Sequence, residues 1–115
     1  MSRKYKLVIF VPDQSVELLK SALFSAGAGR LGDYDQCSWQ TRGTGQFRPL
    51  SVSDPFVGEL NQLEQHDEWR LETLVEESCI KEVLQALRES HPYEEPAFDL
   101  VRLEDPDLGR VLITE

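Results

Sequence analysis

The chain has 115 residues, of which 40% are hydrophobic and 29% charged, and its formal net charge is −9 at pH 7. Such values are typical of a globular protein, and we expect residues 1–115 to form a single domain. The negative charge repels phosphate backbones and argues against nucleic acid as a partner. No apolar run in the sequence reaches membrane-spanning length, so a membrane partner is not expected either.

Two cysteines, Cys37 and Cys79, stand alone without the spacing of metal ligands. We interpret them as reduced thiols, which predicts a cytoplasmic protein. A disulfide between them is the less favoured alternative.

The first half of the chain contains signals for a strand and a helix. Residues 5–11 are β-branched and aromatic, which predicts a central strand. Asp13 or Ser15 can then cap a helix that continues to about residue 26, and Gly27 supplies its C-terminal stop.

The middle of the chain is richer in glycine. A loop at residues 27–32 leads into a predicted strand that ends at Thr41. Residues 42–45 (Arg-Gly-Thr-Gly) predict a tight turn, and 46–49 a short return strand. The region 50–67 is the least regular of the sequence.

The second half repeats the strand–helix–strand order. Residues 68–76 alternate polar and apolar side chains, which indicates a half-buried strand. A helix is predicted from Ser78 to about Ser90, a long strand over 97–103, and an edge strand over 110–113.

This order predicts an α+β protein with a ferredoxin-like βαββαβ sandwich, an extra short hairpin and a C-terminal edge strand. Both helices would cover one face of the sheet, and an uncovered apolar face usually indicates oligomerisation. We therefore expect a closed homo-oligomer. The apolar side chains expected on that face are Trp39, Phe47, Trp69 and Phe98.

Residues 91–96 (His-Pro-Tyr-Glu-Glu-Pro) are the most informative segment. Each proline restricts the residue before it, so His91 and Glu95 should be extended. With Tyr93 and Asp99 nearby, His91, Glu94 and Glu95 form a set that could bind a divalent metal ion. The favoured alternative is that they satisfy backbone amides and inter-subunit contacts at a tight junction.

Neither glycine segment has the pattern of a catalytic or nucleotide site. In the segment 27–32 a helix precedes and a strand follows, the reverse of a dinucleotide fingerprint, so a helix cap is favoured over phosphate binding. No base lies at a readable spacing from Ser38 or Cys37, and Cys79 is more simply a buried thiol. We predict no catalytic residue and a non-enzymatic role.

Several motifs in order resemble a known family. They are the glycines of 27–32 with Tyr34, Cys37 and Ser38; Gly43, Thr44 and Gly45 with Phe47 and Pro49; Glu72; and residues 91–99. Together they resemble the YqfO family, the small PII-like and CutA-like domain inserted in Nif-three-like proteins. The likeness covers about residues 5–103 and departs from the family pattern at 51–55.

The resemblance implies a small cytoplasmic, non-catalytic binding or regulatory protein that assembles as a trimer. Ligand sites in such trimers lie in clefts between subunits, and Gly43, Thr44, Gly45 and Tyr93 are the residues expected there. The alternative is a CutA-like divalent metal-binding protein that uses His91, Glu94 and Glu95. The metal-bearing halves of the larger family members have no counterpart in these 115 residues, so their hydrolase role is not carried over.

Overall fold

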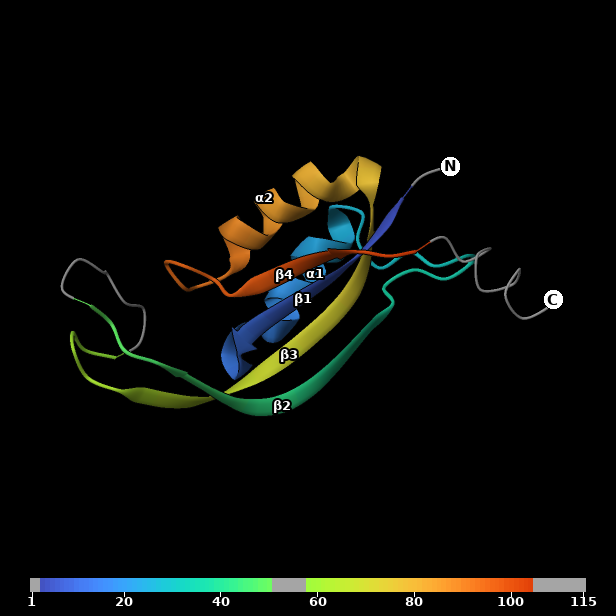
Figure 1. Ribbon diagram of the computed structural model, residues 1–115. Helices are drawn as coiled ribbons and strands as arrows, with labels where there is room; N and C mark the ends of the chain where they lie inside the picture. Colours follow the sequence, from blue (N-terminus) through green and yellow to red (C-terminus); the bar gives the residue numbers. More distant parts are fainter. Residues whose placement is uncertain (1–2, 51–57, 105–115) are drawn as a thin grey trace.

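Two helices cover one face of a four-stranded antiparallel sheet (Figure 1). The computed structural model describes residues 3–50 and 58–104. The strand order is β2-β3-β1-β4, so each helix connects two strands that flank a third. This is the ferredoxin-like arrangement that the sequence predicts. The elements are β1 (Lys4–Pro12), α1 (Val16–Ser25), β2 (Ser38–Phe47), β3 (Glu64–Glu76), α2 (Ile80–Ser90) and β4 (Phe98–Arg102), with single 3-10 turns at Asp13–Ser15 and Glu77–Cys79.

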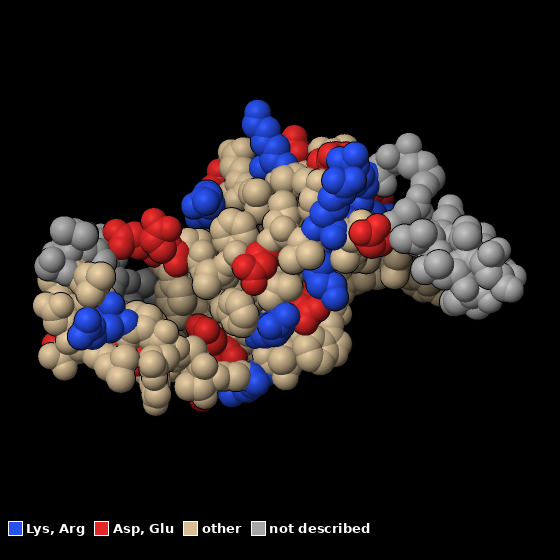
Figure 2. Space-filling view, viewed as in Figure 1, with Lys and Arg blue, Asp and Glu red and all other residues tan. Residues whose placement is uncertain are grey.

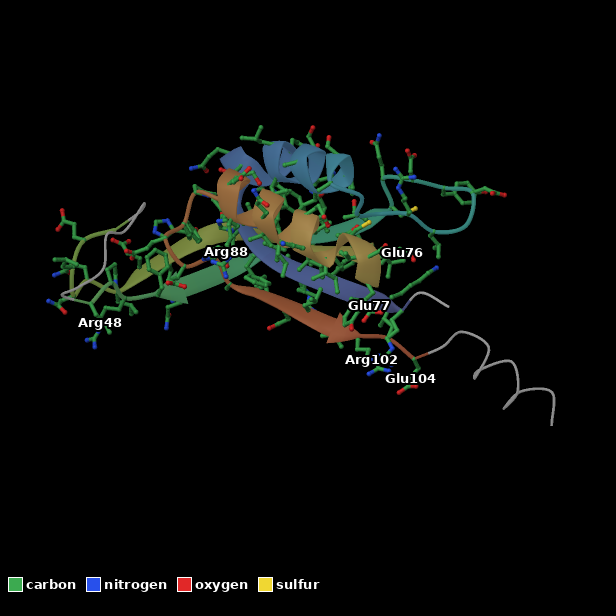
Figure 3. The ribbon with its side chains drawn as sticks, turned by 90° about the horizontal axis from the view of Figure 1, so that it is seen from above. Arg48, Glu76, Glu77, Arg88, Arg102 and Glu104 are labelled. Atoms are coloured by element: carbon green, nitrogen blue, oxygen red, sulfur yellow. The ribbon has the colours of Figure 1, made fainter. Side chains whose placement is uncertain are left out.

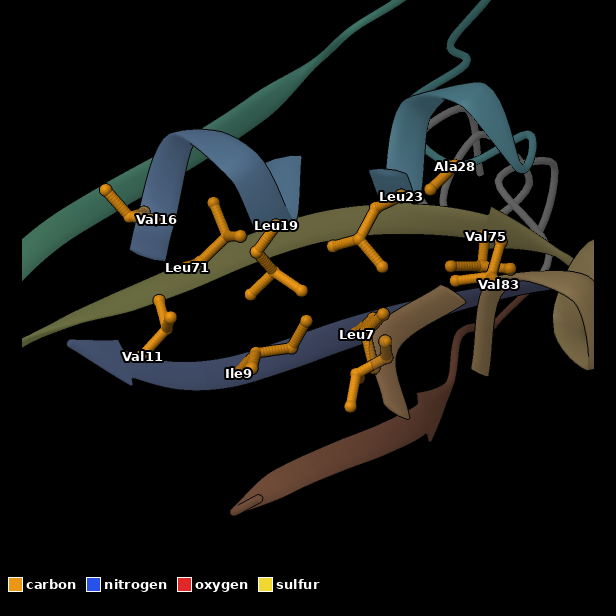
Figure 4. Packing of buried hydrophobic residues seen from close by; sticks show 11 residues of the cluster. Leu7, Ile9, Val11, Val16, Leu19, Leu23, Ala28, Leu71, Val75 and Val83 are labelled. Carbon is orange, nitrogen blue, oxygen red and sulfur yellow. The ribbon is translucent and has the colours of Figure 1, made fainter. Parts of the chain in front are cut away.

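The core lies between the sheet and the helices, and strand alternation decides which residues enter it. β1 directs Leu7, Ile9 and Val11 toward the helices, and all three are fully buried. Amphipathic helix faces supply the other half of the cluster (Figure 4). The buried members are Leu7, Ile9, Val11, Val16, Leu19, Leu23, Ala28, Leu71, Val75, Val83 and Leu87.

The predicted helix ends are confirmed. After α1, Gly27 adopts φ +113°, and its N–H donates to the Phe24 carbonyl at 3.1 Å. The N–H of Ala28 donates to Leu23 at 3.0 Å, which completes a Schellman cap. At the end of α2, His91 is extended (φ −83°, ψ 133°), as the proline after it requires.

The predicted cap at the start of α1 is wrong. Neither Asp13 nor Ser15 makes a side-chain cap hydrogen bond. The Asp13 carboxylate instead accepts hydrogen bonds from Arg42 at 2.6 Å and from the Trp69 indole at 2.7 Å. The Asp13 carboxylate is thus bonded to two side chains of the sheet and not to the backbone amides at the start of α1.

The predicted turn at residues 42–45 is also wrong. β2 is continuous from Ser38 to Phe47, and every residue of it pairs with β3. β3 in turn begins at Glu64, within the region predicted to be irregular. A glycine inside a strand often marks a close approach, and the carboxylate of Glu68 lies where a Cβ of Gly45 would stand.

β2 and β3 continue past the end of β1, whose last pair is Pro12 with Glu68. Residues 44–47 and 64–67 therefore form a two-stranded arm that projects from the rest of the sheet (Figure 1). Arg48 lies at the end of the arm, far from the charged residues at the opposite end of the sheet (Figure 3). Those labelled there are Glu76, Glu77, Arg102 and Glu104.

The two ends of the described fold meet at the other end of the sheet. Tyr5 pairs with Arg102, and the N–H of Leu103 donates to the carbonyl of Lys4 at 2.9 Å. The edge strand predicted over 110–113 lies outside the described residues. Within residues 3–50 and 58–104, no helix is both long and apolar enough to cross a membrane.

The face of the sheet away from the helices, here called the outer face, has no cover within the described chain. Trp39 and Phe47 lie on it, as predicted. The prediction is wrong for Trp69 and Phe98, which pack against the core. Their register explains this, because they pair with Val11 and Ile9, both of which face the helices. The apolar side chains of the outer face are Val8, Phe10, Trp39, Phe47, Leu74 and Val101.

Candidate functional site

The proline segment is fixed to the sheet by His91. This side chain is only 6% exposed. Its Nε2 donates to the Phe10 carbonyl at 2.8 Å, and its Nδ1 accepts the backbone N–H of Tyr93 at 3.2 Å. Burial lowers the pKa of His91, and the bond to Phe10 only partly opposes that effect. The ring is therefore a neutral structural group with both nitrogens occupied.

This geometry gives little support to a metal site within one chain. The described residues contain no group of three His, Cys, Asp or Glu side chains placed to hold a metal ion. Glu94 and Glu95 are exposed on the segment, while His91 is turned into the protein. A divalent ion at His91, Glu94 and Glu95 therefore stays a prediction.

Tyr93 connects the proline segment to the arm. Its ring lies 5.0 Å from that of His91 and 6.1 Å from that of Phe47, between centroids. Phe47 in turn stacks on His66 of the facing strand at 5.8 Å. Aromatic side chains of the segment that follows α2 thus pack against the arm and support it.

Glu68 is the titratable group at the centre of these contacts. Its half-buried position raises the carboxyl pKa, and the contact with Tyr93 and the charge of His66 lower it by less. The Tyr93 pKa is raised, first by burial and then by the Glu68 charge. Burial and the neighbouring Glu68 charge therefore both favour the protonated phenol of Tyr93.

A hollow of about 190 Å³, here called the outer hollow, lies beside Glu68. It runs across three strands and is lined by Phe10, Thr41, Gly43, Thr44, Glu68 and Arg70, with Arg42 at the β2 edge. A Cβ on Gly43 would meet nothing within 4 Å, so the missing side chain leaves this space open.

The predicted ligand residues divide between the hollow and its support. Gly43 and Thr44 line the outer hollow. Gly45 lies under the Glu68 carboxylate and Tyr93 lies beside it, and neither of them lines the hollow itself.

Glu68 and Arg70 were not predicted as site residues. Their only signal in the sequence is alternation, which places them on one face of β3. Arg70 lies over the Phe10 ring at 5.7 Å and donates to Glu72 at 3.1 Å. That hydrogen bond is the main cause of the lowered Glu72 pKa, to which Lys6 also contributes.

The lining of the outer hollow offers several hydrogen-bonding groups. A carboxylate, a guanidinium and the Thr41 hydroxyl can hydrogen-bond a small polar ligand. No serine or cysteine is among the lining residues that the structure describes.

The sequence of this chain is similar to part of several longer proteins. No family model matches the chain. The chain is 44% identical over 104 residues to the GTP cyclohydrolase 1 type 2 homolog of Mycobacterium tuberculosis, which covers 90% of the chain and 27% of the relative. It is 43% identical over 110 residues to the protein of the same name from Bacillus subtilis, at 92% and 30% coverage. The chain thus spans less than a third of these relatives.

Solved structures agree with the fold. A Bacillus cereus protein related to NIF3 superposes with a TM-score of 0.78 and 36% identity, over 90% of this chain and 26% of that one. The periplasmic divalent cation tolerance protein CutA from Archaeoglobus fulgidus superposes with a TM-score of 0.64, over 89% of this chain and 85% of that one. At 14% identity, the CutA likeness concerns the fold alone. The chain is therefore similar in sequence to about a quarter of a NIF3-related protein, and it shares its fold with CutA.

Proposed function

We propose that this chain is a non-catalytic binding module of a NIF3-like protein, which associates with copies of itself through the outer face. A small polar ligand then binds in the outer hollow, where a neighbouring copy closes it. The proposal assigns ligand contact to Gly43, Thr44, Glu68 and Arg70, and a supporting role to Tyr93.

The observation that carries the proposal is the apolar, uncovered outer face. Trp39 is 59% exposed and Val101 50% exposed, on opposite edges of the sheet. Phe10 and Leu74 lie half-buried between them. An apolar surface that extends across all four strands is typical of a protein interface. Because the arm projects beyond the sheet, it can extend such an interface onto a second copy.

Charge does not suggest a nucleic-acid partner. Basic and acidic side chains are interspersed over the described part of the face seen in Figure 2, without a broad basic patch. On the outer face, Glu72 accepts contacts from Lys6 at 3.3 Å and from Arg70 at 3.1 Å. Such paired charges are compatible with burial at a polar interface rim.

The experiment is the solution mass of the chain by light scattering, with a trimer as the expected form. Trp39→Asp and Leu74→Asp should each shift the mass toward that of a monomer. Leu18→Asp is the matched control, because Leu18 is 66% exposed on α1, on the covered side of the sheet. A wild-type monomer, or an assembly unaffected by both outer-face variants, would contradict the proposal.

The metal-binding alternative needs a separate measurement. It requires His91 to exchange one of its two hydrogen bonds for a metal ion. Metal content measured on the same chromatographic peak tests this. Stoichiometric metal that disappears in His91→Ala, with the assembly intact, would favour the alternative over the outer hollow.

A further inference from the structure

A second hollow lies on the helix side of the molecule and shares no lining residue with the outer hollow. It has a volume of about 410 Å³ and lies between α1 and the segment 28–38. This helix-side hollow is lined by Glu17, Lys20, Phe24, Arg30, Asp35 and Gln36, with serine hydroxyls from both walls. Its volume is within the range of small-molecule sites.

The loop wall of the helix-side hollow is held in place by the sheet. The N–H of Gly29 donates to the Leu74 carbonyl at 2.7 Å, and Cys37 donates to the Gly29 carbonyl at 2.8 Å. The Thr73 hydroxyl donates to the Cys37 carbonyl at 2.7 Å. Two bonds to β3 and one within the loop preorganise this wall, which lowers the entropy cost of binding a ligand.

Backbone conformation brings specific side chains to this wall. Gly29 has φ +85°, and a Cβ there would approach the Phe24 ring to 2.9 Å, so glycine lets that ring lie against the loop. Gln36 has φ +55°, a conformation that L residues other than asparagine and aspartate adopt rarely. A strained non-glycine residue that lines a hollow suggests a role for its side chain.

The charges of the helix-side hollow are balanced. Lys20 and Arg30 supply two cations, and Glu17 and Asp35 two anions. Lys20 contacts Glu17 at 3.3 Å, but the Glu17 side chain is 77% exposed, so this pair is weak and exchanges readily for a ligand. A lining with both signs of charge and one aromatic wall complements a molecule with both signs of charge and an apolar part.

We infer that the helix-side hollow binds a small zwitterion of the α-amino acid class. Lys20 and Arg30 receive the carboxylate, while Glu17 and Asp35 receive the ammonium group. The apolar side chain of the ligand lies on Phe24, and the Gln36 amide hydrogen-bonds its polar atoms. Charge-assisted hydrogen bonds of this kind are the strong contacts of such a site.

The experiment is calorimetric titration of the full chain with the twenty L-amino acids, one at a time. Succinate and ethylamine, which carry one sign of charge each, are the ligand controls. At least one amino acid should bind, and neither control should. Arg30→Ala and Asp35→Asn should each weaken that binding about tenfold or more, as expected for a lost charge-assisted bond. Lys81→Ala, on the exposed face of α2, should leave it unchanged.

Two further variants separate this site from the fold and from the outer hollow. Gln36→Gly should keep the melting temperature near that of the wild type, because glycine tolerates the left-handed conformation, and should still weaken binding. Thr44→Ala should not affect binding. Absence of heat with every amino acid, full affinity in Arg30→Ala, or equal binding of succinate would each overturn the inference.

Discussion

The two faces of the sheet are built by the same strands but differ in what covers them. On the helix side, Leu71 is 1% exposed and belongs to the core. Leu74, three residues along the same strand, faces the other way and is only half-buried. The residue type at a strand position therefore does not by itself determine how deeply the side chain is buried. Register and the position of the helices decide which leucine stabilises the fold and which remains for a partner.

Leu71→Ala should have the largest effect on the fold. Removing a fully buried leucine leaves a cavity and should lower the free energy of unfolding by about 2–5 kcal/mol. Leu74→Ala is the matched change and should cost clearly less, because less of that side chain leaves water. Urea unfolding of both variants tests this, and equal losses would contradict the difference between the two faces.

Gly45→Ala should cause the next largest loss of stability, whereas Gly43→Ala should leave the stability nearly unchanged. A Cβ at position 45 collides with the Glu68 carboxylate, which must move away, and because that carboxylate is the end of a flexible side chain the cost should be only about 1 kcal/mol. At position 43 the Cβ enters open space. Thermal unfolding measures both, and a Gly43→Ala variant as unstable as Gly45→Ala would argue against the continuous β2 strand.

His91 should make stability depend on pH. The pKa of His91 in the folded state is below its ordinary value of about 6.5. Between these two pKa values the imidazole is protonated in the unfolded chain but mostly neutral in the folded one. The free energy of unfolding should therefore fall as pH falls from about 6.5 to the lowered pKa. Urea unfolding across this range measures it. His91→Gln should remove that part of the slope, while His66→Gln should retain it.

The smallest effect is expected for Arg42→Ala. Arg42 and Asp13 form an exposed pair, and Asp13 keeps its bond from Trp69 when Arg42 is removed. The loss should be about 0.2–1 kcal/mol and should shrink in high salt. Asp13→Ala removes both contacts and should cost more. If Arg42→Ala cost as much as Leu71→Ala, the pair would have a larger role than its exposure allows.

What could be predicted from the sequence was mostly local. Gly27 ends α1 and Pro92 ends α2 because their effects depend only on neighbouring backbone. β2 was missed because its two glycines indicate a turn when taken alone, whereas the strand is stabilised by pairing with β3, far along the chain. Trp69 was predicted on the wrong face of the sheet for the same reason, because the face on which it lies is set by its pairing with Val11.

The candidate site shows the same division. Gly43 and Thr44, which were predicted to contact a ligand, line the outer hollow, and the ligand contact itself stays a prediction. Glu68 and Arg70 join Phe10 there only through the register of β1 against β3, which no short motif encodes. The approach of Tyr93 to Glu68 likewise depends on His91 reaching back to Phe10.

The hydrogen bond between Leu103 and Lys4 has a consequence for how this fold can be carried. Neighbouring strands lie about 4.8 Å apart, so a polypeptide enters and leaves the sheet at almost the same point. A longer protein could accommodate the whole unit within one surface loop, with little displacement of the two sides of that loop. A fold whose two ends lie side by side is suited to insertion into a larger protein. The match of the chain to only part of each relative agrees with this.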